Sequence, residues 1–102
     1  MLTNVCSCQV TSSIKVEADY DADPLWCNTC GWNLDIDEVP LTDTIKDALF
    51  NWQQQYGRIS IKEHNAAGLN LTEIVKKELG PDCTVVFMPM KLFPENNGGI
   101  PF

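Results

Sequence analysis

Apolar and polar residues alternate from Ile14 to Tyr20, which is typical of a strand with one buried face. The residues 21–24, Asp-Ala-Asp-Pro, interrupt this pattern. Leu25–Cys27 is again apolar and predicts a short strand that runs back beside the first. We therefore expect residues 1–34 to form a small β-structure.

A helical period begins after Pro40. Thr42 is a suitable N-cap, because its hydroxyl can accept a hydrogen bond from a free N–H of the first turn. Apolar residues spaced i, i+4, i+7 and i+11 then predict one buried stripe, and Gly57 is expected to end the helix. The stripe consists of Ile45, Leu49, Trp52 and Tyr56.

A second helix is expected before Gly80-Pro81, a pair of residues that commonly ends helices. Its predicted apolar face consists of Ala67, Leu71, Ile74, Val75 and Leu79. The segment 58–63 is consistent with either a short strand or an irregular connection. Thr84–Met88 is β-branched and apolar, as in a buried strand, and Pro89 limits how far that strand can pair.

Charge is distributed unevenly along the chain. The 102 residues carry 14 acids and seven Lys or Arg residues, and the net charge of −7 disfavours direct binding to nucleic acid. All of this net charge arises in residues 1–47, so we expect a protein partner with a basic surface. No segment reaches the ~18 to 20 apolar residues of a membrane-spanning helix. The first residues do not have the pattern of a signal peptide, so the expected location is the cytoplasm.

Four of the five cysteines form two closely spaced pairs, Cys6-Ser7-Cys8 and Cys27-Asn28-Thr29-Cys30. Two such pairs, brought together by a hairpin, supply the four sulfurs of a tetrahedral Zn²⁺ site. Four protein ligands leave no position open for water, so the predicted site is structural. Iron, or cysteines that hold no metal, are the alternatives. The fifth cysteine, Cys83, is expected to be a buried thiol.

The segment Cys27–Trp32 resembles the Cys-x-x-Cys-Gly knuckle of zinc ribbons and rubredoxins, in which the glycine permits a tight turn that directs backbone N–H groups at the sulfurs. The Cys6-x-Cys8 pair departs from the two-residue spacing of that family. The order of the two pairs is also similar to the redox-switch zinc module of a bacterial holdase chaperone. From about Glu38 onward the chain resembles short bacterial proteins of uncharacterised function, which implies an α+β fold and no particular activity.

Together these patterns predict an α+β fold: a small zinc-stabilised β-structure at the N-terminus, and two helices packed on a small sheet with a C-terminal strand. We expect one domain over residues 1–102. Its parts would be a zinc-binding β subregion at 1–38, a helix–helix–strand subregion at 39–91 and an irregular tail at 92–102.

Other candidate chemistry is sparse. His64 is the only histidine and is expected to lie at the surface or at a helix cap. Asp19, Asp21 and Asp23 match the opening of a calcium-binding loop, but Pro24 stands where that loop needs glycine. We therefore predict a non-catalytic protein–protein interaction module, acting as an adaptor, regulator or inhibitor.

The alternative function is a small thiol or redox-active protein, or an enzyme, that uses Cys83, His64 or a reactive zinc thiolate. The sequence leaves the oligomeric state open.

Overall fold

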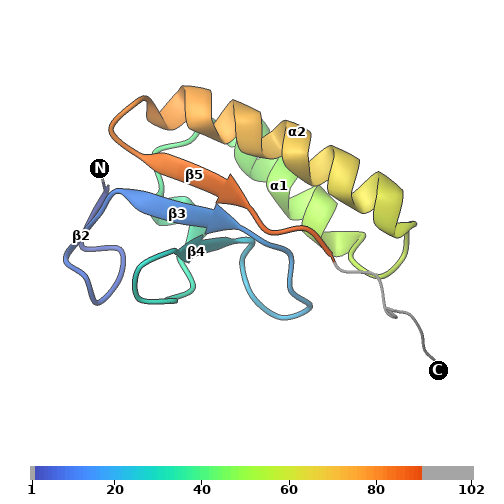
Figure 1. Ribbon diagram of the computed structural model, residues 1–102, viewed down its shortest axis with the longest axis horizontal. Helices are drawn as coiled ribbons and strands as arrows, with labels where there is room; N and C mark the ends of the chain where they lie inside the picture. Colours follow the sequence, from blue (N-terminus) through green and yellow to red (C-terminus); the bar gives the residue numbers. More distant parts are fainter. Residues whose placement is uncertain (1, 91–102) are drawn as a thin grey trace.

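A three-stranded sheet carries two helices on one face in the computed structural model, which describes residues 2–90 (Figure 1). The sheet consists of β3 (Ser13–Val16), β4 (Leu25–Cys27) and β5 (Thr84–Phe87), with β3 in the centre. β3 pairs antiparallel with β4 and parallel with β5. The α+β fold and the C-terminal strand are as predicted, while the expected tail at 92–102 lies outside the described residues.

A second, smaller sheet lies at the N-terminus. β1 (Leu2–Thr3) and β2 (Val10–Thr11) pair antiparallel, with Leu2 opposite Thr11. Leu2 is nevertheless buried and belongs to the same hydrophobic core as the main sheet. The short hairpin is therefore packed against the rest of the fold.

The first helix, α1 (Asp43–Gln54), follows the short 3-10 helix η1 (Ile36–Glu38). The predicted N-cap is confirmed, because the Thr42 side chain accepts a hydrogen bond from the N–H of Ile45. The helix ends at Gln54, earlier than expected, and Gly57 lies in the turn that follows. The predicted stripe is buried at Ile45, Leu49 and Trp52 and half-buried at Tyr56.

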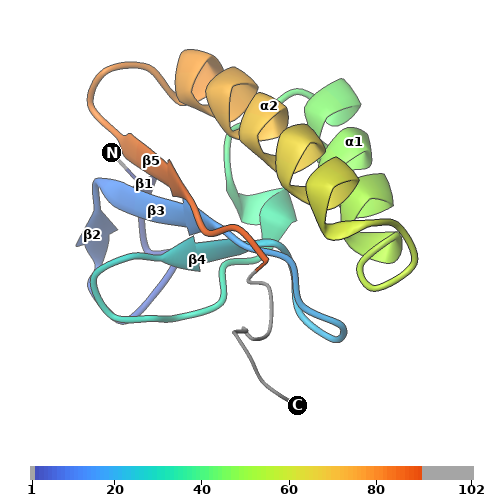
Figure 2. The ribbon, with the colours of Figure 1, turned by 45° about the vertical axis from the view of Figure 1, so that its right-hand side comes forward.

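The second helix, α2 (Ile61–Leu79), begins where the sequence pattern was ambiguous. Ser60 and Glu63 form a capping box, in which each side chain bonds the other residue's backbone N–H. Both helices pack on the same face of the sheet, and α2 lies along β5 (Figure 2). Within residues 2–90, neither helix is long and apolar enough to cross a membrane.

The predicted inner face of α2 was wrong in part. Leu71 and Val75 are buried as expected, but Ala67 is exposed. The buried positions in the first half of the helix are His64 and Gly68 instead. Neither residue carries an aliphatic side chain, so a search for hydrophobic periodicity passes over both.

Gly68 is required by the packing of two aromatic rings. A Cβ atom at this position would lie 2.7 Å from Cζ2 of Trp52 and would also collide with the ring of Phe87. The missing side chain therefore lets α2 approach α1 and β5 closely.

His64 is also not the surface or capping residue that the sequence suggested. Its side chain is 1% exposed and stacks on Trp52, with ring centroids 4.6 Å apart and an interplanar angle of 19°. The ring of Tyr56 lies 5.4 Å from the imidazole on a tilted plane. The histidine is thus enclosed by aromatic neighbours.

Replacing Trp52 tests this packing. Trp52 contacts the His64 and Phe87 rings, and its indole N–H donates a 3.0 Å hydrogen bond to the backbone oxygen of His64. Trp52→Ala should lower the free energy of unfolding by about 3–5 kcal/mol. Phe50→Ala, on the same helix but 57% exposed, is the matched control in chemical denaturation. Equal midpoints for the two variants would contradict the central role of Trp52.

Candidate functional site

Four cysteine side chains from two separate segments of the chain meet at one end of the sheet. Cys6 and Cys8 lie in the loop between β1 and β2, whereas Cys27 ends β4 and Cys30 follows it. The four sulfur atoms all lie within 4.8 Å of one another. The structure therefore brings together the four cysteines that the sequence singled out.

The first cysteine pair lies in a tight loop. The N–H of Asn4 donates to the backbone oxygen of Gln9 at 2.6 Å, which closes the base of the loop. Asn4 and Gln9 both have a positive φ, of 59° and 63°, a conformation that is uncommon for residues other than glycine. Within the loop, the N–H of Cys8 donates to the sulfur of Cys6.

The second pair is held by a turn that depends on glycine. Gly31 has a φ of 79°, and its N–H donates to the backbone oxygen of Cys27 at 2.9 Å. The N–H groups of Thr29 and Cys30 are directed at the sulfur of Cys27. This is the turn that the sequence predicted from Gly31.

The spacing of the sulfurs suits a metal ion. With a Zn–S bond of about 2.3 Å, tetrahedral geometry requires sulfurs about 3.8 Å apart. The sulfurs of Cys8 and Cys27 are 3.8 Å apart. The group could therefore hold a metal ion after only small movements of the remaining sulfurs.

The ionisation of the four cysteine thiols is coupled, and a bound cation would favour their thiolate forms. Burial acts to raise the pKa of Cys27, but the Thr11 hydroxyl and the neighbouring backbone N–H groups outweigh it and lower this pKa to about 6. The adjacent thiol of Cys30, together with burial, raises the pKa of Cys8 to about 12. Four thiolates this close repel one another, so all four can ionise together only when a cation neutralises them.

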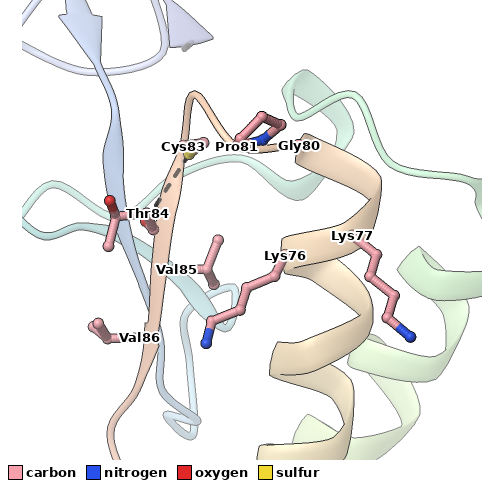
Figure 3. A pocket seen from close by; sticks show the side chains of 8 residues that line it. All are labelled: Lys76, Lys77, Gly80, Pro81, Cys83, Thr84, Val85 and Val86. Carbon is pink, nitrogen blue, oxygen red and sulfur yellow. Dashed lines mark hydrogen bonds between the residues drawn. The ribbon is translucent and has the colours of Figure 1, made fainter.

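Cys83 lies apart from the group of four cysteines, at the entrance to β5. It lines an apolar cavity of about 530 Å³ beside the last turn of α2, together with Val85 and the stems of Lys76 and Lys77 (Figure 3). Its side chain is 4% exposed, which confirms the predicted buried thiol. Burial raises the pKa of Cys83, so the unreactive thiol form is favoured.

His64 does not form a catalytic pair with Cys83. Both ring nitrogens of His64 are buried without a hydrogen-bond partner among the described residues. The ring borders a cavity of about 20 Å³, which it shares with Glu17, Tyr56 and Met88. Sequence reasoning missed this site because a single histidine gives no periodic signal.

A larger groove of about 700 Å³ lies at the surface next to this small cavity. Glu17, Tyr56 and Met88 line both of them. The groove lies at the far end of β3 from the cysteines, between that strand, the turn joining the two helices and the segment after β5. The exposed Tyr20 and the half-buried Lys15 also line it. Residues 2–90 therefore form two distinct candidate sites, the cysteine group and this groove.

The chain belongs to the family described as Serratia CdiI immunity protein-like, whose model matches residues 12–90. Membership of an immunity protein family implies binding of a toxin partner protein and agrees with the inhibitor role among the functions predicted above. No curated protein matches the chain. The matched segment includes Cys27 and Cys30 but begins after Cys6 and Cys8.

The buried imidazole predicts an acid-dependent loss of stability. Burial lowers the pKa of His64 below its ordinary value of 6.5. Below about pH 6.5 the unfolded chain therefore binds a proton that the folded chain does not, and the free energy of unfolding falls as the pH falls. His64→Phe keeps an aromatic ring at this position but cannot titrate.

The free energy of unfolding of the wild type, relative to His64→Phe, should decline between about pH 7.5 and 5.5. Denaturant titrations at several pH values measure this difference, and contributions from the cysteines cancel because both proteins contain them. Parallel pH profiles for the two proteins would contradict the prediction.

Proposed function

We propose that this chain neutralises a toxin protein by binding to it, without catalysing a reaction. The match to the immunity protein family over residues 12–90 is the observation that carries the proposal. The chemistry of the described residues agrees with it, because the ring nitrogens of His64 have no hydrogen-bond partner among them and Cys83 is a buried thiol. A binding inhibitor needs a rigid surface, which the sheet and its two helices supply.

We further propose that the toxin surface is basic. Four acids, Glu17, Asp19, Asp21 and Asp23, lie between the end of β3 and the start of β4. Their side chains are exposed or half-buried, and one nearby base, Lys15, forms a 2.9 Å ion pair with Glu17. Exposed charges of one sign steer a partner of opposite charge and raise the association rate.

A structural zinc ion held by Cys6, Cys8, Cys27 and Cys30 is the third part of the proposal. Four sulfurs leave no open position, so the ion would stabilise the fold and take no part in chemistry. The family match begins after Cys6 and Cys8, which supports a role in stability that is separate from toxin binding. A reducing cytoplasm would keep these thiols available to the metal.

We propose that the chain folds as one domain, because both of its halves contribute to one sheet. β3 comes from the part that contains the cysteines, and β5 follows the two helices, yet the two strands pair over four residues. Separating residues 1–38 from 39–91 would remove one edge of that sheet.

Toxin neutralisation can be tested by capture and rescue. The tagged chain is used to capture proteins from its native host, and the bound partner is identified by mass spectrometry. We expect that partner to arrest growth when expressed alone in a test strain. Co-expression of this chain should restore growth. Continued arrest in the presence of the bound chain would contradict the proposal.

Zinc content provides an independent test. Gently purified protein should contain one zinc per chain by elemental analysis, and a strong chelator should unfold at least the first ~35 residues, since structural zinc sites commonly contribute on the order of 10 kcal/mol. Cys30→Ser should lose the metal. Cys83→Ser is the matched control and should retain it. Iron in place of zinc, or loss of zinc from the control, would show that the assignment is wrong.

A further inference from the structure

The surface groove combines an exposed aromatic pair with a rigid support. Tyr20 is 73% exposed, yet its ring lies 4.5 Å from that of Tyr56 at an angle of 55°. Gly57 lies directly beneath it, since a Cβ atom there would be 2.6 Å from the Tyr20 hydroxyl oxygen. An exposed tyrosine held in this way offers a large apolar face that loses little conformational freedom when a partner binds.

The inner wall of the groove adjoins an unsatisfied polar group. His64 is 1% exposed, and neither of its ring nitrogens has a partner among the described residues. The cavity beside it, of about 20 Å³, can hold one water molecule or the polar tip of a ligand. Because that cavity and the groove share Glu17, Tyr56 and Met88, a side chain entering the groove approaches the imidazole.

Of the residues in 2–90 that line the groove, Glu17 is the one acid, and Asp19 and Asp21 flank Tyr20 in the same loop. Among the described residues that line it, Lys15 is the one base, and it already pairs with Glu17. Asp19 follows closely along the same loop, and its backbone N–H is held by the side chain of Gln53 on α1. Burial, with added contributions from Tyr20, Asp19 and Glu17, raises the pKa of Tyr56, as expected near carboxylates.

These features match the chemistry of one kind of side chain. A guanidinium group stacks on tyrosine faces, pairs with carboxylates and donates several hydrogen bonds in diverging directions. A neutral imidazole has one unprotonated nitrogen that can accept such a bond. An aliphatic side chain would leave the imidazole without a partner.

We propose that the groove receives an arginine side chain of the toxin partner, stacked against Tyr20 and Tyr56, paired with Glu17 and hydrogen-bonded to His64 directly or through one water. This inference rests on the proposed function and specifies where on this chain the toxin binds. It makes Tyr20 a central anchor of the interface, since such aromatic residues often dominate binding energy.

The toxin identified by capture and rescue serves as the probe. Tyr20→Ala should weaken its binding at least tenfold in calorimetry. Phe50→Ala and Leu69→Ala are matched controls, because these apolar side chains are 57% and 54% exposed on α1 and α2, and each should change the dissociation constant less than twofold. Because Tyr20 is mostly exposed, Tyr20→Ala should still fold. Circular dichroism of the variant checks that its fold is unchanged.

Substitutions in the toxin test which of its side chains binds in the groove. Each arginine and lysine of the toxin is replaced by alanine, and double-mutant cycles with Tyr20→Ala identify the coupled residue. One arginine should couple strongly to Tyr20. Coupling to a lysine instead, or to none of these residues, would overturn the assignment of arginine.

The contact with His64 is followed without any substitution in this chain. In ¹⁵N spectra of the intact complex, the unprotonated ring nitrogen of His64 should shift on binding, and the shift should be absent with the toxin variant that lacks the coupled arginine. An unchanged His64 signal would overturn the hydrogen bond. If wild-type protein binds no toxin, the proposed function fails. If it binds and Tyr20→Ala binds equally well, only the groove assignment fails.

Discussion

The pairing of β3 with both of its neighbours is the interaction on which the rest of the structure depends. This strand has only four residues, but it joins β4 on one side and β5 on the other. Its side chains Ile14 and Val16 are fully buried beneath the helices. Because β5 runs parallel to β3, the chain must cross the sheet between β4 and β5, and α1 and α2 provide that crossover.

The two candidate sites lie at opposite ends of this same strand. At its start, Ser13 accepts a hydrogen bond from the N–H of Asn28, which fixes the turn of the second cysteine pair beside the first. At its end, Glu17 and Ala18 continue into the wall of the small cavity beside His64. A short central strand thus separates a site suited to stabilising the fold from a surface suited to binding.

The local elements could be predicted because their signals are local. The N-cap at Thr42, the turn at Gly31 and the alternation along β3 each depend on neighbouring residues, and all are found in the structure. The cysteine group was predictable for a similar reason, since two short pairs leave few geometric choices. The β1–β2 hairpin is too short to be stable alone, which explains why the apolar pattern did not indicate its strands.

What the sequence did not reveal depends on contacts between distant segments. His64 is buried because Trp52 and Tyr56 on the preceding helix and turn enclose it, and Gly68 is buried because two aromatic rings occupy the space of its missing side chain. Neither relation has a periodic signature. The pairing of β5 with β3 likewise joins segments about 70 residues apart, beyond the reach of local patterns.

An apolar residue in place of His64 would satisfy the same aromatic neighbours without leaving polar atoms unpaired. A buried polar group that lacks a partner lowers stability, typically by about 1–3 kcal/mol. Such local conflicts between sequence and fold are expected where function opposes stability. The conflict at His64 lies directly beside the groove, next to an exposed tyrosine and a run of acids. Stability alone does not account for this combination, whereas the proposed binding of a cationic side chain of a partner gives the imidazole a hydrogen-bond donor.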